Sequence, residues 1–296
     1  MGSAMWALVQ YRTGAGIAVG VQVDQDVYAA PQLFGGRTLL EIVEDWPRWS
    51  TVLRTLDDRA LTRVHEPDVV APLTYPNKLI CAGANYYDHA EEMGAARPDP
   101  EAEPFFFLKS PTTTVVGPTA DVPINTDGRS TVDWEAELGV VIGRRTHAVA
   151  EAEAAQAIAG YVVANDISDR GVFHRRGSVA AAFDWDWLGH KNQDAFCPLG
   201  PGLVPSWLVP DPHALKIRLD VNGVVKQDSN TSQMVVKVPG LIAAASKLMT
   251  LEPGDIILTG TPAGVGLPRH DFLSPGDVVT VEIEGVGRIC NTVVGK

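Results

Sequence analysis

The stretch Val132-Asp133-Trp134-Glu135-Ala136-Glu137-Leu138-Gly139-Val140-Val141-Ile142 passes from spaced acidic residues into a continuous apolar run. Side chains alternate between the two faces of a β-strand, so Glu135 and Glu137 share one side. Asp133 has the same parity, and spacing alone does not exclude it as a third member. Because the apolar run predicts entry into a core, the two glutamates would repel each other unless a cation or a shared proton compensates them.

A third oxygen ligand is available from Asp166, which follows the predicted strand Tyr161-Val162-Val163-Ala164. A site made of Glu135, Glu137 and Asp166 would suit a hard cation, Mg²⁺ or Mn²⁺, better than zinc. The alternative is that alternating glutamates mark the solvated face of a sheet. Spacing leaves both interpretations open.

Composition indicates a folded protein with a sizeable core. The chain has 296 residues, 45% of them hydrophobic and 20% charged, and no stretch approaches the roughly 18 apolar residues of a membrane span. The formal net charge is -12, which argues against a nucleic-acid partner, because phosphate binding needs a basic surface. The short run His174-Arg175-Arg176 is either solvated loop charge or a clamp for a substrate carboxylate.

The ends and the cysteines favour a cytoplasmic location. Cys81, Cys197 and Cys290 stand far apart, without the spacing of a zinc or redox motif. Residues 1–4 read as a cloning scar before a native Met5, and no signal-peptide pattern is present.

The pattern predicts an α+β, mainly β protein with a small α+β domain over residues 1–72 and a larger domain over residues 73–296. Strands are expected at residues 6–11 and 16–21, a helix capped by Thr38 with Glu41 at the capping-box position, and a helix from Trp49 to Leu56. In the larger part, clear helical periodicity is confined to residues 150–158 and 238–248. Common nucleotide, serine-hydrolase and zinc-protease motifs are absent.

From Lys78 to Val294 the chain resembles the fumarylacetoacetate hydrolase family. Ordered blocks carry the resemblance: residues 78–86 with 88–94, Phe107-Leu108-Lys109, residues 132–143, residues 160–166, Lys191 with Cys197-Pro198-Leu199-Gly200-Pro201, Val221-Asn222-Gly223, and residues 258–266. The resemblance implies that Glu135, Glu137 and Asp166 bind one divalent cation per subunit. It also implies a mixed β-roll around the metal, a variable N-terminal domain and a homodimer.

The same resemblance suggests roles for further residues. Lys109 and Lys191 map to family lysines near the metal, where they could neutralise a substrate carboxylate or an enolate. His89 and Glu92 stand three residues apart, so on one helical turn the glutamate could orient the imidazole as a general base toward water. Thr261 resembles a substrate-contacting hydroxyl, and Arg170 and Tyr87 are further candidate substrate contacts. By spacing alone, a surface i,i+3 pair is the favoured interpretation of His89 and Glu92.

Two positions depart from the family pattern after Asp166. Gly171 replaces an aspartate and Phe173 replaces a glutamine, which exchanges polar contacts for an apolar wall. Trp185 and Trp187 follow within the same stretch. We therefore expect a substrate larger or more aromatic than oxaloacetate, unless these rings only pack the loop.

These residues predict an enzyme that acts on a small keto acid or diketone. The leading hypothesis is hydrolysis of a C–C bond in an acylpyruvate or related β-diketone, with water activated by His89 and Glu92. The same site would serve decarboxylation of an oxaloacetate-type 2-keto acid, or isomerisation or hydration of a hydroxydienedioate. A non-catalytic metal-binding protein is the remaining alternative.

Overall fold

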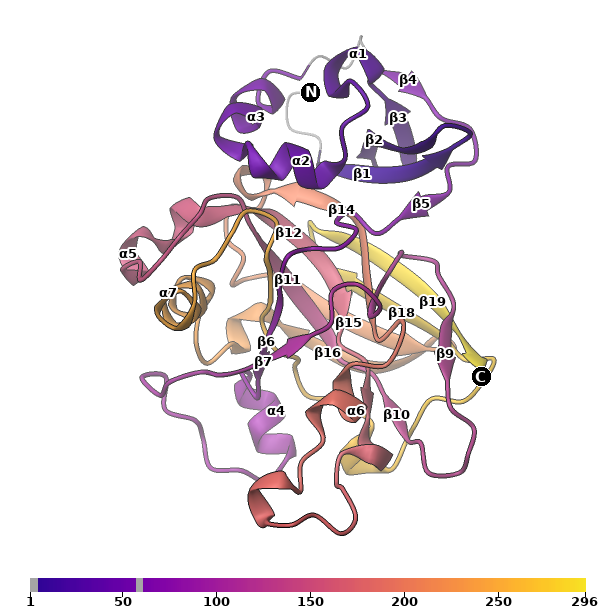
Figure 1. The fold of residues 1–296 in the computed structure, drawn as a ribbon, viewed down its shortest axis with the longest axis vertical. Coiled ribbons are helices and arrows are strands. Elements are labelled where there is room, and N and C mark those ends of the chain that lie inside the picture. Colours follow the sequence, from indigo (N-terminus) through magenta and orange to yellow (C-terminus); the bar gives the residue numbers. More distant parts are fainter. Residues whose placement is uncertain (1–4, 57–60) are drawn as a thin grey trace.

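The computed structural model describes residues 5–56 and 61–296, so the suspected cloning scar at residues 1–4 lies outside the described residues. The N-terminal part forms the upper layer of the molecule (Figure 1). Its elements are β1 (Trp6–Thr13), β2 (Gly16–Val23), β3 (Asp26–Ala29), α1 (Pro31–Phe34), α2 (Leu39–Glu44), α3 (Trp46–Leu53), β4 (Thr62–Arg63) and β5 (Val69–Val70).

The capping box predicted at the start of α2 is confirmed. The hydroxyl of Thr38 accepts a hydrogen bond from the Glu41 amide, and the Glu41 carboxylate accepts one from the Thr38 amide at 2.7 Å. The next helix was predicted too late: α3 begins at Trp46 and ends at Leu53. Pro47 lies in its first turn, where proline needs no hydrogen-bond donor and its fixed φ suits a helix.

The described residues of the larger part contribute to two large sheets and one two-stranded sheet. The first includes β6 (Leu79–Gly83), β7 (Phe105–Lys109), β8 (Val115–Val116), β11 (Ala136–Ile142), β12 (Ile158–Asn165), β14 (Cys197–Pro205) and β17 (Ile256–Leu258). The second consists of β9 (Val122–Ile124), β15 (Lys216–Val221), β16 (Val224–Asn230), β18 (Val278–Ile283) and β19 (Gly287–Gly295). A short pair joins β10 (Val132–Asp133) to β13 (Ser168–Asp169).

Helices are few and short, as expected. The α-helices of the larger part are α4 (Tyr87–Glu92), α5 (Glu151–Ala154), α6 (Trp187–Lys191) and α7 (Val238–Leu248). The single turns of 3₁₀-helix are η2 (Ala155–Ala157), η3 (Arg170–Val172), η4 (Ala181–Phe183), η5 (Ser206–Leu208), η6 (Thr231–Gln233) and η7 (Leu267–Arg269). Helix α7 has the predicted bounds, and the predicted helix over residues 150–158 is divided between α5 and η2. None of the described helices is long and apolar enough to cross a lipid bilayer.

The first sheet runs in the order β4-β3-β2-β1-β14-β12-β11-β17-β6-β7, with β5 beside β1 and β8 beside β14. Its central strands β11 and β12 are buried along their whole length, which agrees with the apolar runs 138–142 and 158–164 that they contain. Val140 packs into the core shared with the second sheet, whereas Val141 packs toward the N-terminal helices. Position 139 has no room for a side chain on the side that faces the N-terminal helices, because a Cβ there would stand 2.6 Å from the Val162 side chain.

The segment from Val132 to Ile142 is not one continuous strand as predicted. Residues 132–133 pair with β13, and pairing with β12 begins only at Ala136. Between these strands the Glu135 amide donates to the Asn165 side chain at 2.9 Å, and the Glu135 carbonyl accepts from the Asp166 amide at 2.9 Å. The chain therefore passes from the short β10–β13 sheet to the first sheet at Glu135.

The N-terminal part is joined to the rest through β1, which pairs with β14, and through Trp207 of η5. The Trp207 ring stacks on Trp46 at 5.7 Å between centroids, contacts Trp6 at 6.5 Å, and is covered by the Arg54 guanidinium at 4.1 Å. The division of the chain at residue 72 stays a prediction. The two parts nevertheless share one sheet and one apolar core.

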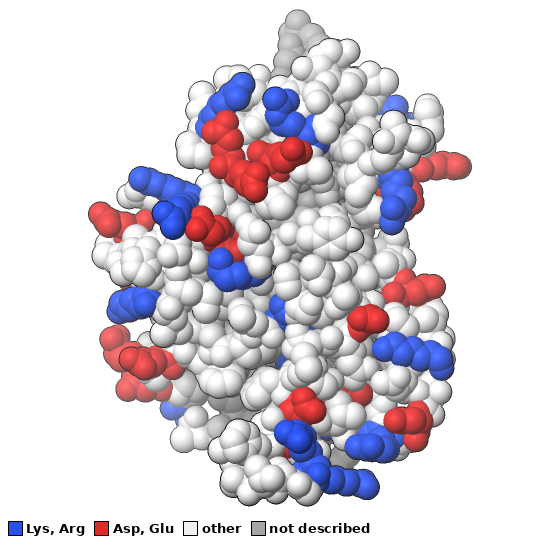
Figure 2. All heavy atoms as spheres, in the orientation of Figure 1, with Lys and Arg blue, Asp and Glu red and all other residues white. Residues whose placement is uncertain are grey.

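Acidic and basic side chains are interspersed over the face shown in Figure 2, without an extended basic area. This distribution agrees with the expectation that the protein does not bind nucleic acid, which stays a prediction.

Replacing Trp207 by alanine should lower the free energy of unfolding by about 2 kcal/mol, because the half-buried ring contacts two tryptophans and one guanidinium. Trp207→Phe should lose less than half of that amount. Urea unfolding followed by circular dichroism measures both, and an unchanged midpoint for Trp207→Ala would contradict the assigned role.

A neutral His213 stabilises the start of α7. Its Nε2 accepts a hydrogen bond from the Val238 amide at 3.1 Å. The pKa of His213 is lowered, first by burial and then by the nearby Lys237 ammonium, which together outweigh Asp211. A positive charge would also be unfavourable at the N-terminus of a helix.

Because the folded-state pKa of His213 lies below the unfolded value of about 6.5, the unfolded chain binds the proton more readily. The contribution of His213 is fully present above that value and is lost as the pH falls below it. Denaturant unfolding between pH 7.5 and 5 should show a smaller loss of stability in His213→Gln than in the wild type. Parallel curves for the two proteins would be inconsistent with this role.

Candidate metal centre

Three buried carboxylates converge where β11 and β12 meet. Glu135 precedes β11, Glu137 lies in it, and Asp166 follows β12. One oxygen of each lies within 4.8 Å of the other two, and all three side chains are buried. The structure thus brings together the three residues predicted as metal ligands.

Two lysines, distant in sequence, stand against these carboxylates. Lys109, at the end of β7, donates to Asp166 Oδ1 at 2.5 Å and to the Ile167 carbonyl at 2.9 Å. Lys191, at the end of α6, donates to Glu135 Oε2 at 2.7 Å and to Asp166 Oδ2 at 2.8 Å. Both ammonium groups are buried. The predicted placement of these lysines beside the acidic residues matches the structure.

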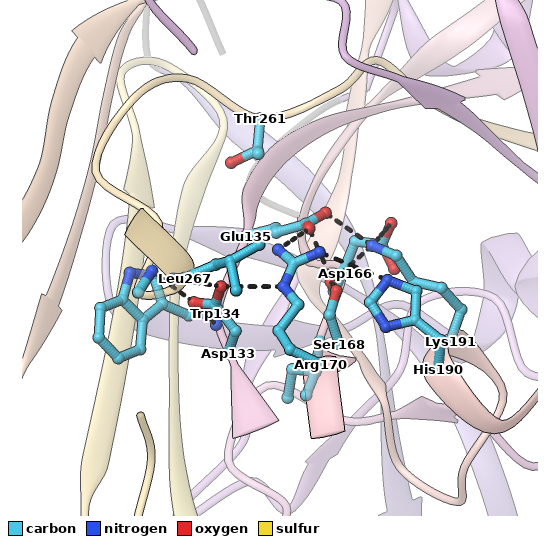
Figure 3. Close-up of polar contacts among 12 residues, drawn as sticks. Asp133, Trp134, Glu135, Asp166, Ser168, Arg170, His190, Lys191, Thr261 and Leu267 are labelled. Atoms are coloured by element: carbon cyan, nitrogen blue, oxygen red, sulfur yellow. Dashed lines mark hydrogen bonds and ion pairs between the residues drawn. The ribbon is translucent and has the colours of Figure 1, made fainter. Parts of the chain in front are cut away.

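Asp133 does not join the three carboxylates. Figure 3 shows Arg170 between Asp133 and Glu135, with its Nε 3.0 Å from Asp133 Oδ2 and its Nη2 2.6 Å from Glu135 Oε1. Asp133 also accepts hydrogen bonds from the amides of Gly266 at 2.6 Å and Leu267 at 3.0 Å. The structure therefore decides the alternative left open by strand parity: Asp133 ties Arg170 to the loop that follows β17.

The three carboxylates are not equivalent. Burial alone would raise the pKa of Glu135, but Lys191 and Arg170 hold it below its usual range. The pKa of Glu137 is raised by burial and by the charges of Asp166 and Glu135, although the Gly260 amide donates to it at 2.7 Å. Glu137 is thus the carboxylate least compensated by the protein.

The charges fit a bound divalent cation. When all groups are ionised, Lys109, Lys191 and Arg170 oppose four carboxylates, so one negative charge remains in excess. A divalent cation would turn this into an excess of one positive charge, which would attract an anionic keto acid. An all-oxygen donor set of this kind suits Mg²⁺ or Mn²⁺.

Helix α4 carries the predicted His89–Glu92 pair. His89 Nδ1 lies 3.6 Å from Glu92 Oε2, beyond hydrogen-bond distance, and makes no hydrogen bond with any residue that the structure describes. The Glu92 carboxylate instead accepts from the Gly264 amide at 2.9 Å and from Arg269 at 2.7 Å. These contacts fasten α4 to the loop after β17.

The same loop carries Thr261, which lies opposite Glu135 and Asp166 in Figure 3. Its hydroxyl is buried and accepts a hydrogen bond from Gln227 at 2.8 Å. Its predicted contact with substrate stays a prediction.

The two tyrosines at the start of α4 differ in their surroundings. Tyr87 stacks under Arg97 at 4.0 Å, and none of its recorded contacts leads to the carboxylates. Its predicted role as a substrate contact therefore stays a prediction. Tyr86 is wholly buried, and its pKa is raised by burial and by the charge of Glu137. Sequence reasoning missed Tyr86, although it ends a block shared with the family.

His190 is a second residue that sequence reasoning missed. Its Nδ1 lies 3.0 Å from the Asp169 carbonyl, and its Nε2 lies 3.4 Å from Arg170. Burial, followed by Lys191 and Arg170, lowers its pKa to about 3, so the imidazole is neutral at physiological pH. Its position next to Lys191 was the only available signal.

The departure at Gly171 has a backbone cause. A Cβ there would stand 1.8 Å from the Arg129 carbonyl oxygen, so the loop could not carry a side chain without moving. The buried carboxylate of Asp169 accepts from the Gly171 amide at 3.1 Å and from the Thr131 amide at 3.0 Å. Asp169 thus holds this loop through backbone hydrogen bonds. In the family pattern the aspartate of this loop stands at position 171 instead.

Comparison with known proteins agrees with the fold and the site. Residues 78–294 match the family described as Fumarylacetoacetate (FAA) hydrolase C-terminal. The chain belongs to the fumarylacetoacetate hydrolase family and is an enzyme. The resemblance recognised in the sequence is therefore confirmed, and the non-catalytic alternative is set aside.

Two relatives are named as oxaloacetate tautomerases. The Homo sapiens protein "Oxaloacetate tautomerase FAHD2B, mitochondrial" is 45% identical over 231 residues, covering 77% of this chain and 70% of the relative. The Xenopus laevis protein "Oxaloacetate tautomerase fahd2, mitochondrial" is 45% identical over 228 residues, covering 76% and 68%.

Solved structures confirm the fold. A fumarylacetoacetate hydrolase from Exiguobacterium antarcticum superposes with a TM-score of 0.85 at 29% identity, covering 98% of this chain and 100% of that one. Maleylpyruvate hydrolase from Sphingobium sp. SYK-6, in complex with manganese(II) and pyruvate, has a TM-score of 0.77 at 29% identity, covering 97% and 99%.

Replacing Glu137 by glutamine should abolish high-affinity Mn²⁺ binding, because the carboxylate least compensated by the protein loses its charge. Calorimetric titration of Mn²⁺ measures this directly. In the wild type, saturating Mn²⁺ should also raise the free energy of unfolding by about 3 kcal/mol at a hundredfold excess over the dissociation constant.

The matched control is Glu153→Gln, which changes an exposed acid on α5 and should bind Mn²⁺ like the wild type. Unchanged Mn²⁺ affinity in Glu137→Gln would argue against the assigned ligand set.

Proposed function

We propose that this protein is a Mg²⁺- or Mn²⁺-dependent enzyme, with one cation per subunit, that interconverts the keto and enol forms of an oxaloacetate-type 2-keto acid. The observation that carries the proposal is the buried triad of Glu135, Glu137 and Asp166 with its flanking lysines, in a chain 45% identical to proteins named as oxaloacetate tautomerases. We also propose a homodimer, as the family resemblance implies.

A divalent cation at this triad would polarise the keto and carboxylate oxygens of a 2-keto acid and stabilise the negative charge of its enolate. The protein's own charges favour the same anion. Lys109 and Lys191 place two ammonium groups against Asp166 and Glu135, and Arg170 adds a guanidinium beside Glu135. In a buried site these fixed charges stabilise a developing oxyanion more than they would in water.

Tautomerisation needs only proton transfer. A proton leaves the carbon next to the keto group, the double bond moves from C=O to C=C, and a proton is added to the keto oxygen, while no bond of the carbon skeleton forms or breaks. His89 is suited to carry this proton, because an imidazole can accept and return one near neutral pH, and its Nδ1 makes no hydrogen bond to the described residues. Thr261, which Figure 3 shows near Glu135 on the loop after β17, would position the substrate.

Hydrolysis of an acylpyruvate, the leading hypothesis from sequence, is the second candidate. It is supported by the likeness to maleylpyruvate hydrolase. It would require Glu92 to orient His89 toward water, yet the Glu92 carboxylate is engaged by Gly264 and Arg269 and stands 3.6 Å from the imidazole. The relatives named as tautomerases and this geometry together favour the alternative reaction on the same site.

His89→Asn should lower the rate of oxaloacetate tautomerisation at least a hundredfold, because the proton carrier is lost. The loss of enol absorbance in the presence of Mg²⁺ or Mn²⁺ measures the rate. His147→Asn, which changes an exposed histidine, is the control and should retain wild-type activity.

Products separate the candidates. Tautomerisation leaves the substrate mass unchanged, decarboxylation releases CO₂ from oxaloacetate, and hydrolysis yields two acids from an acylpyruvate. Cleavage of acylpyruvates without tautomerisation of oxaloacetate would replace the proposed function by the second candidate.

A further inference from the structure

Aromatic side chains from three segments form a connected cluster beside the carboxylates. We call it the aromatic wall and define it as Phe105, Phe107, Phe173, Trp185 and Trp187. Ring centroids lie 4.8 Å apart for Phe107 and Trp187, 5.1 Å for Phe173 and Trp187, and 4.6 Å for Phe173 and Trp185. Phe105 extends the cluster and lies 5.3 Å from Trp187.

The wall is continuous with the charged centre. The Lys191 ammonium, which contacts Glu135 and Asp166, lies 5.2 Å from the centroid of the Phe107 ring. The Phe173 ring stacks on His190 at 4.2 Å. Because Trp187, His190 and Lys191 belong to the same short helix α6, the wall and the buried lysine are positioned together.

The wall is not a closed core. Phe105 is 52% exposed and Trp185 is 49% exposed, while Phe107, Phe173 and Trp187 are half-buried. Large apolar groups beside a polar site are usually covered by a ligand or a partner. The polar side chains that the family pattern would place at residues 171 and 173 are absent, so this side of the site offers aromatic carbon instead.

We propose that the aromatic wall binds the end of the substrate remote from its keto-acid group, and that the preferred substrate is a 2-keto acid carrying an aryl substituent. The proposal rests on the proposed function for the keto-acid end, which the lysines and a cation held by the carboxylate triad would bind. An aryl ring would gain edge and face contacts with Phe107, Phe173 and Trp187 that a carboxylate or a methyl group cannot make.

The test compares two oxalate-like ligands, oxamate and N-phenyloxamate, which differ only in the phenyl group. Each is titrated calorimetrically into the Mn²⁺-loaded protein, so the readout is affinity and not turnover. N-phenyloxamate should bind at least tenfold more tightly than oxamate. In Phe173→Ala and in Trp187→Ala, this ratio should fall by about three- to tenfold, as expected for the loss of one aromatic contact.

Phe183→Ala is the matched control, because Phe183 lies in the same segment, is 55% exposed and makes none of the ring contacts of the wall. It should keep the wild-type ratio. Phe173→Leu retains an apolar side chain if the alanine variant fails to fold, and it should also lower the ratio. N-cyclohexyloxamate should bind more weakly than N-phenyloxamate, and equal affinity would overturn the preference for an aryl group.

The two proposals fail differently. If oxaloacetate is tautomerised but the two oxamates bind equally, the aromatic wall is not a substrate site and the proposed function stands. If the phenyl preference depends on Phe173 and Trp187 but no keto acid is tautomerised, the proposed function fails and the binding site stands. No binding of N-phenyloxamate, or a ratio unaffected by Phe173→Ala, Phe173→Leu and Trp187→Ala, overturns the inference.

Discussion

The burial of several carboxylates in one core is the constraint on which the rest of this structure depends. Removing an ionised carboxylate from water costs several kcal/mol unless positive charge and hydrogen-bond donors replace the lost hydration. Glu135 and Asp166 meet this condition because Lys109 and Lys191 reach them from β7 and α6, whereas Glu137 accepts a hydrogen bond from the Gly260 amide and its pKa stays raised. The fold therefore has to bring together segments that lie far apart in the chain.

The sheet order provides this arrangement. Antiparallel pairing of β11 with β12 places Asp166 beside Glu135 and Glu137, and β17 with β6 connects them to β7, which ends at Lys109. Asp133 extends the same network to the loop after β17 through Gly266 and Leu267. Asp133, which strand parity allowed as a metal ligand, thus connects Arg170 of the site to the loop that carries Thr261.

The aromatic segment lies at the border of this charged network. Asp169 anchors its start, Gly171 allows it to pass close to the Arg129 carbonyl, and α6 ends it with Lys191. This segment contributes Phe173, Trp185 and Trp187 of the wall as well as the buried Lys191, so the packing of these rings and the position of the cation are linked. Members of one family can differ in substrate through such border residues while sharing the chemistry at the carboxylates.

Sequence by itself determined the local elements and the carboxylates. The sequence predicted the apolar strands, the capping box at Thr38 and the helix Val238–Leu248, because each depends on residues that are close together in the chain. Parity placed Glu135 and Glu137 together, while the ordered family blocks identified Asp166, Lys109 and Lys191 as their neighbours. Only the tertiary structure decided that Asp133 pairs with Arg170, that Glu92 is engaged by Arg269, and that Tyr86 and His190 border the site. Those contacts join residues from separate elements. The periodicity of one segment does not indicate which charged side chain of another segment will pair with its own charged groups.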